Sequence, residues 1–230
     1  AGPMLTRDER AFFAEAQPFG FILFDRNLED AEQIRTLTAS LREAVGRDAP
    51  ILIDQEGGRV QRLRPPLARD WLPALDHLAR AAPGDRARLM WLRYRIVAAE
   101  LAGYGIDVNC APLADIAMEN THPVLKNRCY GDTLAEVVPI ARAVAGGLAA
   151  GGVLPALKHI PGHGRGTLDS HLDLPHVDTP APVLAETDFA AFKALADLPL
   201  GMTAHIVYDA LDASAPATTS PAMIRVIRED

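Results

Sequence analysis

The chain has 230 residues, of which 49% are hydrophobic, and it carries a formal net charge of -7. This apolar content supplies a substantial core and excludes a disordered chain. The negative charge argues against a surface that holds nucleic acid or anionic lipid. We therefore expect a globular protein with no nucleic-acid or membrane partner, and at this length a single domain over residues 1–230.

The cysteines and the N-terminus indicate the compartment. The two cysteines, Cys110 and Cys129, are too few for a disulfide scaffold. The N-terminal residues lack the basic-then-apolar pattern of a signal peptide, and no apolar run approaches the roughly 20 residues that span a bilayer. We expect a cytoplasmic protein.

Short apolar runs alternate with longer patterns of helical spacing along the chain. The runs are β-branched, end in polar residues and predict buried strands, whereas the longer patterns predict amphipathic helices. Glycines, among them Gly103 and Gly152, follow two of the helices, where left-handed backbone angles end a helix. In chain order we expect a strand over 20–24, a helix over 31–45, a strand over 50–55, a helix over 86–102, a strand over 105–112, a helix over 134–150, a strand over 152–159, a helix over 186–197 and a strand over 200–208.

This alternation predicts an α/β fold with a parallel sheet, which fits both a doubly wound sheet and a TIM barrel. The barrel is favoured because polar residues gather at the ends of at least four strands, and in a barrel those ends form one rim. About five of the roughly eight strands of a barrel are found, so we expect the barrel to be incomplete at the C-terminus. The polar residues are Asp54, Glu56, Asp115, Lys158, His159 and His205.

The segment KHIPGHGRGTLDSH, residues 158–171, is rich in histidine and glycine. His159 and His163 have the spacing of a helical zinc site, but Pro161 and the glycines break a helix. The glycines form a flexible loop, but no GK[ST] follows to make a phosphate loop. Proton transfer remains, since Asp169 and His171 share one face of an extended segment and a carboxylate stabilises a charged imidazole. A solvated loop is the alternative.

Two further segments carry candidate residues. In IDQEGGRVQRL, Asp54 ends a predicted strand and can accept hydrogen bonds from sugar hydroxyls, while Arg62 offers a fork of donors. An Asp54–Arg62 ion pair that only holds the loop is the alternative. Arg128 lies in a turn-rich loop, where an arginine is usually solvated. Lys158 and His159 end an apolar strand, a place where we expect a lysine to have a role.

Four ordered motifs, KHIPGHGRGTLDSH, IDQEGGRVQRL, NRCYG and MTAHIVY, together resemble the family 3 glycoside hydrolases of the β-N-acetylglucosaminidase type. The resemblance implies a TIM barrel with no metal or cofactor. It also implies a small carbohydrate as partner, because these enzymes release N-acetylglucosamine from muropeptides during cell-wall recycling. The residues that it implies for substrate binding are Asp54, Arg62, Arg128, Lys158 and His159, and those for acid/base catalysis are His171 with its dyad partner Asp169.

The family pattern also requires a carboxylate nucleophile for a retaining double displacement. In this family it is an aspartate of an SDD-like motif in a strand soon after the segment that ends at Asp230. We therefore expect the nucleophile and the last strands to lie beyond residue 230. Two alternatives stay open: a carbohydrate-binding barrel without catalysis, and a metal-dependent barrel hydrolase that uses His159, His163 and Asp169.

Overall fold

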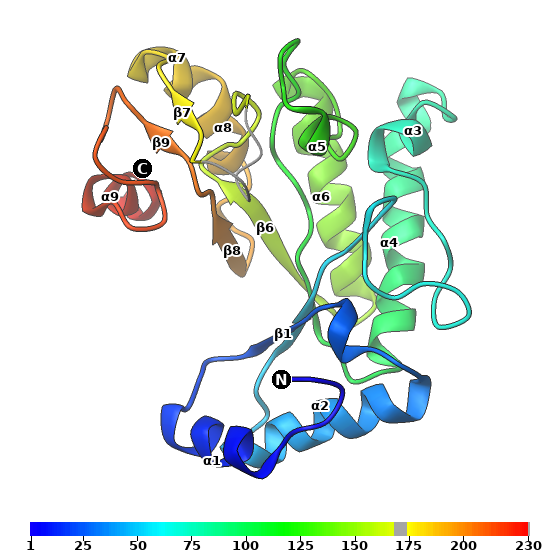
Figure 1. Cartoon of the computed structure of the whole chain (residues 1–230). Helices are drawn as coiled ribbons and strands as arrows, with labels where there is room; N and C mark the ends of the chain where they lie inside the picture. The colour runs from blue at the N-terminus through cyan, green and yellow to red at the C-terminus, as the bar shows by residue number, and fades with distance from the viewer. Residues whose placement is uncertain (168–173, 230) are drawn as a thin grey trace.

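The computed structural model describes residues 1–167 and 174–229, in which helices alternate with strands (Figure 1). The helices are α1 (Arg7–Ala16), α2 (Ala31–Val45), α3 (Ala74–Leu78), α4 (Arg86–Ala102), α5 (Pro123–Lys126), α6 (Leu134–Ala150), α7 (Ala181–Glu186), α8 (Asp188–Lys193) and α9 (Pro221–Glu229), with 3-10 turns at Asp25–Asn27 and Pro83–Asp85. The strands are β1 (Phe21–Leu23), β2 (Ile51–Ile53), β3 (Gln55–Gly57), β4 (Val60–Gln61), β5 (Val108–Asn109), β6 (Leu154–Ile160), β7 (His176–Val177), β8 (Leu200–Thr203) and β9 (Val207–Tyr208).

The main sheet is parallel and has the strand order β1-β2-β5-β6-β8. Each strand therefore lies beside its predecessor in the sheet, whereas the order of a doubly wound sheet reverses at a switch point. Strands β3 and β4 form a separate antiparallel hairpin, and β7 pairs with β9 in a second small sheet. This order fits the barrel and not the doubly wound sheet.

The three helices predicted at 31–45, 86–102 and 134–150 form with those bounds, because each buries one apolar face. Helix α2 is capped at its N-terminus by Asp30, whose carboxylate accepts from the backbone N–H groups of Glu32 and Gln33, and at its C-terminus by Gly46, with a φ of 66°. Helices α4 and α6 lie side by side (Figure 1). Gly147 allows this approach, since a Cβ there would overlap the carbonyl oxygen of Trp91.

The helix predicted over 186–197 forms only in part, as α8 over Asp188–Lys193. Thr187, with φ -119° and ψ -89°, breaks the chain between α8 and the preceding α7. The break turns Asp188 inward, where its buried carboxylate accepts from Arg165 Nε at 2.6 Å and from the Thr187 hydroxyl at 2.8 Å. A tertiary ion pair thus overrides the local helical pattern.

The predicted strand over 200–208 is also divided. The carbonyl groups of Ala204 and Ile206 accept from Thr218 Oγ1 and from the backbone of Ala217, so this stretch leaves the main sheet and β9 pairs with β7. Similarly, the strand predicted over 50–55 ends at Ile53, and the one over 105–112 is paired only as β5.

Gly103, expected to be left-handed after its helix, has a φ of -60°. Gly105, with a φ of 73°, takes that conformation instead, whereas Gly152, with a φ of 79°, is left-handed as expected.

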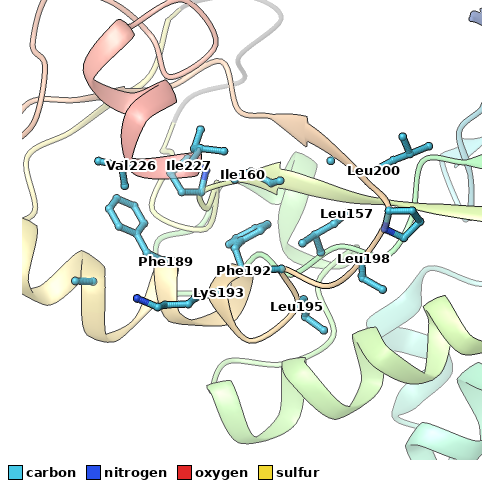
Figure 2. Close-up of a pocket in the computed structure, with 15 residues that line it drawn as sticks. Leu157, Ile160, Phe189, Phe192, Lys193, Leu195, Leu198, Leu200, Val226 and Ile227 are labelled. Carbon is cyan, nitrogen blue, oxygen red and sulfur yellow. The ribbon is translucent and has the colours of Figure 1, made fainter. Parts of the chain in front are cut away.

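The core lies between the sheet and helices α2, α4 and α6, and a smaller apolar cluster fills the space among β7, β9 and α9. An apolar groove of about 470 Å³ runs between β6, β8, α8 and α9, where Phe189, Phe192 and Ile227 line it (Figure 2). None of the helices that the structure describes is long and apolar enough to cross a membrane.

Candidate functional site

Five of the residues predicted from the sequence line one cavity of about 370 Å³. They come from the segments that follow β2 and β5 and from the end of β6 itself. Side chains after β1 and around the end of β8 complete the wall, so both edge strands of the sheet contribute to the same cavity. The predicted residues are Asp54, Arg62, Arg128, Lys158 and His159, and the others include Phe24, His122, His163, Thr203 and His205.

Asp54 is the carboxylate that follows β2. Its Oδ1 accepts from Lys158 Nζ at 2.7 Å, and its Oδ2 accepts from Arg62 Nη2 at 3.3 Å. Burial by itself would raise the pKa of Asp54, but the Lys158 ammonium outweighs it and holds that pKa below its usual value. The ion pair considered as the structural alternative therefore forms, and it leaves an ionised carboxylate on the cavity wall.

Glu56 is a site residue to which the sequence assigned no role. It is buried and accepts from Arg128 Nε at 2.9 Å, from Arg128 Nη2 at 2.7 Å and from Lys158 Nζ at 2.6 Å. Despite burial, Arg128 and Lys158 hold the pKa of Glu56 well below its usual value. Arg128 is consequently a largely buried, bidentate partner and not a solvated loop arginine. Its sequence separation of 72 residues from Glu56 gives no local signal of this pairing.

The turn after Glu56 depends on Gly57 and Gly58, whose φ angles of 113° and 59° disfavour other residues. Behind this turn, the buried Arg93 donates to the carbonyl groups of Glu56 and Leu72. A side chain at position 57 would overlap the Arg93 guanidinium. The strand end, the two glycines and Arg93 together fix the place of Glu56.

His159 is held by Asp115, a fully buried carboxylate in the segment after β5. His159 Nδ1 lies 2.7 Å from Asp115 Oδ2, and the backbone N–H of His163 donates to Asp115 Oδ1 at 2.6 Å. Burial opposes ionisation of Asp115, but the imidazole of His159 keeps the pKa of the carboxyl below its usual value. Burial also lowers the pKa of the His163 imidazole, which favours its neutral form.

The glycine-rich segment after β6, residues 161–167, lies against residues 116–122. Thr121 Oγ1 donates to the Gly164 carbonyl, the His122 N–H donates to the Gly166 carbonyl at 3.2 Å, and a Cβ on Gly164 would overlap the carbonyl oxygen of Ile116. The predicted acid/base pair, Asp169 and His171, lies just after this segment and outside the described residues.

The described residues 1–167 and 174–229 contain no group of three His, Cys, Asp or Glu side chains that could hold a metal ion. Asp169, which the metal-dependent alternative needs, lies outside these residues. The cysteines are poor nucleophiles, since both are buried and burial raises the pKa of Cys110 to about 12.

The cavity wall thus combines guanidinium and ammonium donors with an ionised carboxylate and an imidazole. Sugar hydroxyls donate and accept hydrogen bonds, and such a wall offers partners for both. The apolar side chains of Phe24 and Met202, which also line the cavity, suit the C–H face of a ring. The arrangement can therefore bind and orient a small polyhydroxylated ligand.

Residues 4–230 match the glycosyl hydrolase family 3 N terminal domain. A β-hexosaminidase of Glaesserella parasuis serovar 5 is 34% identical over 230 residues, which cover 99% of this chain and 65% of that protein. A β-hexosaminidase of Alkalilimnicola ehrlichii is 36% identical over 224 residues, which cover 95% of this chain and 63% of that protein. The chain therefore spans just under two thirds of the length of these two relatives.

The crystal structure of NagZ from Neisseria gonorrhoeae, in complex with N-trifluoroacetyl-D-glucosamine, is similar with a TM-score of 0.88 at 32% identity. The match covers 98% of this chain and 68% of that one, and it confirms the expected α/β fold of the TIM-barrel type. Over almost its whole length, the chain belongs to glycosyl hydrolase family 3 and corresponds to the N-terminal domain of that family.

Proposed function

We propose that the full-length gene product is a retaining exo-β-N-acetylglucosaminidase. The observation that carries this proposal is the convergence of Asp54, Arg128, Lys158 and His159 on one cavity of about 370 Å³ in a chain of family 3. Relatives at 34% and 36% identity are named β-hexosaminidases, and a similar structure holds an N-acylated glucosamine analogue. These support an N-acetylhexosamine as the sugar.

The residues take distinct roles in this proposal. Asp54 accepts hydrogen bonds from the hydroxyls of the bound sugar, and Arg62, Lys158 and His159 surround the same sugar. Arg128 keeps Glu56 ionised and also lines the cavity. Their shared task is to hold the anomeric carbon in a reactive position, which lowers the entropic part of the barrier.

The chemical steps in this proposal belong to residues outside those that the structure describes. His171, oriented by Asp169, protonates the leaving oxygen and then takes a proton from water. An aspartate outside residues 1–230 attacks the anomeric carbon, forming a covalent glycosyl-enzyme that water hydrolyses with net retention. No metal or cofactor takes part.

We further propose that the substrates are N-acetylglucosamine-containing muropeptides, that the protein acts in the cytoplasm in peptidoglycan recycling, and that residues 1–230 are one catalytic domain. A hydrolase of this kind removes terminal N-acetylglucosamine from a small soluble fragment.

A test of the activity follows a chromogenic N-acetyl-β-glucosaminide with the full-length gene product. We expect turnover, with the β-anomer as the first product seen by NMR. Asp54→Asn should lower kcat/KM about 30–150-fold, because one charged hydrogen-bonding group is lost. This corresponds to about 2–3 kcal/mol of lost transition-state stabilisation. Asp25→Asn is the matched control, since Asp25 also approaches Arg62, at 3.7 Å, but is largely exposed. We expect no measurable effect there.

Three results would contradict the proposal or part of it. Tight binding of N-acetylglucosamine without turnover of any glycoside would favour a carbohydrate-binding barrel. Activity that zinc removal abolishes and zinc addition restores would favour a metal-dependent hydrolase. An equal effect of the Asp54 and Asp25 substitutions would remove Asp54 from the sugar site.

A further inference from the structure

Asp115 is a buried carboxylate with two different donors, and neither the sequence motifs nor the family resemblance gave it a role. It is fully buried, and its two oxygens contact different N–H groups. Oδ2 lies 2.7 Å from His159 Nδ1, while Oδ1 accepts the backbone N–H of His163 at 2.6 Å. One side chain therefore contacts both a residue of the cavity wall and the start of the glycine-rich segment.

We propose that Asp115 is a positioning residue, which holds His159 in the tautomer with its proton on Nδ1 and thereby presents Nε2 to the cavity. That Nε2 then contacts the sugar rests on the proposed function. The same carboxylate fixes the backbone of His163, so the cavity wall and the glycine-rich segment keep a constant relative position. His159 lines the cavity, and its Nε2 has no hydrogen-bond partner among residues 1–167 and 174–229.

The geometry explains why a carboxylate is needed here and an amide would not serve. Both oxygens of Asp115 receive N–H donors, and an amide has only one oxygen. The donor on His163 is a backbone N–H, which can only donate a hydrogen bond. In an Asp115→Asn variant the amide oxygen stays with that group, and the amide NH₂ then faces His159 Nδ1. The histidine must accept there, so its proton moves to Nε2 and the tautomer inverts.

The Asp115→Asn substitution is a specific test, because it changes little besides the hydrogen bonds of this side chain. Asn and Asp have almost the same volume, and the ionisable groups that surround Asp115 stay in place. These are His159 and His163 from β6 and the following segment, Arg128 and Cys129 from the loop after α5, and Tyr208 from β9.

The first measurement needs no variant. In ¹⁵N-labelled full-length protein, NMR of the imidazole nitrogens should show a proton on Nδ1 of His159. A neutral His159 with a bare Nδ1 and a proton on Nε2 would overturn the proposal. This result also holds if the Asp115 variant fails to fold.

The second measurement compares two chemically matched Asp–His pairs. Asp115→Asn should move the His159 proton to Nε2, weaken N-acetylglucosamine binding in calorimetry, and lower kcat/KM by about 10–100-fold, mainly through KM. Asp209→Asn is the control, because Asp209 Oδ1 lies 2.8 Å from His176 Nδ1 in a partly exposed pair next to β7 and β9. It should change kcat/KM by less than about twofold.

A double-mutant cycle separates positioning from a general structural effect. In a His159→Gln background, Asp115→Asn should cause almost no further loss of sugar affinity, because its effect passes through His159. Equal losses in both backgrounds would overturn the proposal. If the protein binds sugar and shows the expected tautomer but turns over no glycoside, the proposed function fails while the role of Asp115 stands.

Discussion

At the residue scale, the cavity holds a buried row of alternating charges. Lys158 Nζ lies between Asp54 Oδ1 at 2.7 Å and Glu56 Oε1 at 2.6 Å, and Arg128 Nη2 ends the row at 2.7 Å from the same Glu56 oxygen. The side chains of Lys158 and Glu56 are 2% and 4% exposed, whereas that of Asp54 is 15% exposed. Glu56 therefore anchors the two cations, which leaves Asp54 as the carboxylate that can reach a ligand.

Glu56→Gln should destabilise the protein and alter its response to acid. Removing one partner leaves the buried Arg128 and Lys158 poorly compensated, so we expect a loss of about 3 kcal/mol in unfolding free energy at pH 7. The pKa of Glu56 is lower in the folded than in the unfolded chain. Its ionisation therefore contributes stability that is present above an unfolded pKa of about 4.3 and lost as pH falls toward the folded pKa.

Guanidinium unfolding at neutral pH and at stepwise lower pH measures both effects. The variant should lose less stability than the wild type as the pH is lowered below the unfolded pKa of Glu56. Glu136→Gln is the control, because Glu136 pairs with Arg86 at 3.2 Å in a much more exposed position, and its loss should cost about 0–1 kcal/mol. Equal losses for the two variants, with parallel acid curves, would contradict the anchoring role of Glu56.

At the element scale, the sequence predicts the helices and strand ends that depend on the local spacing of apolar and polar residues. Helices α2, α4 and α6 follow from apolar periodicity, and the polar ends of the strands locate Asp54, Lys158 and His159 at one rim. What depends on distant partners is not predictable in this way. The break at Thr187 depends on the ion pair with Arg165. The division of the strand over 200–208 depends on residues 217–218, which donate hydrogen bonds to carbonyl groups of that strand.

The segment after β6 offers a prediction at this scale. Gly164→Ala should separate the glycine-rich segment from Ile116, because the added Cβ would overlap the Ile116 carbonyl oxygen. We expect a loss of about 1–3 kcal/mol in unfolding free energy and a lower affinity for N-acetylglucosamine. Gly84→Ala is the control, as a Cβ there meets nothing within 4 Å. Unchanged stability and affinity in Gly164→Ala would show that this contact is dispensable.

At the scale of the whole molecule, the sheet must curl to build the site. Phe24 follows β1 and Thr203 ends β8, the two edges of the sheet, yet both line one cavity of about 370 Å³. A flat sheet would hold its edges about 20 Å apart, given roughly 4.8 Å between neighbouring strands. The curvature therefore brings Asp54, Arg128 and Lys158 together from separate segments, and all three line the proposed sugar site.

The last prediction separates binding from chemistry. A chain of verified mass that consists of residues 1–230 contains the proposed sugar-binding residues but not the proposed nucleophile. It should bind N-acetylglucosamine in calorimetry, and Asp54→Asn in the same chain should weaken that binding. It should not turn over a chromogenic N-acetylglucosaminide, because no glycosyl-enzyme can form without the carboxylate.

The full-length gene product is the positive control, and sedimentation at the assay concentration checks for association through the open edges at β1 and β8. Steady turnover by a monomeric chain of residues 1–230 would place the nucleophile within these residues. Loss of that turnover in Asp54→Asn would then make Asp54, and not a later aspartate, the first candidate for it.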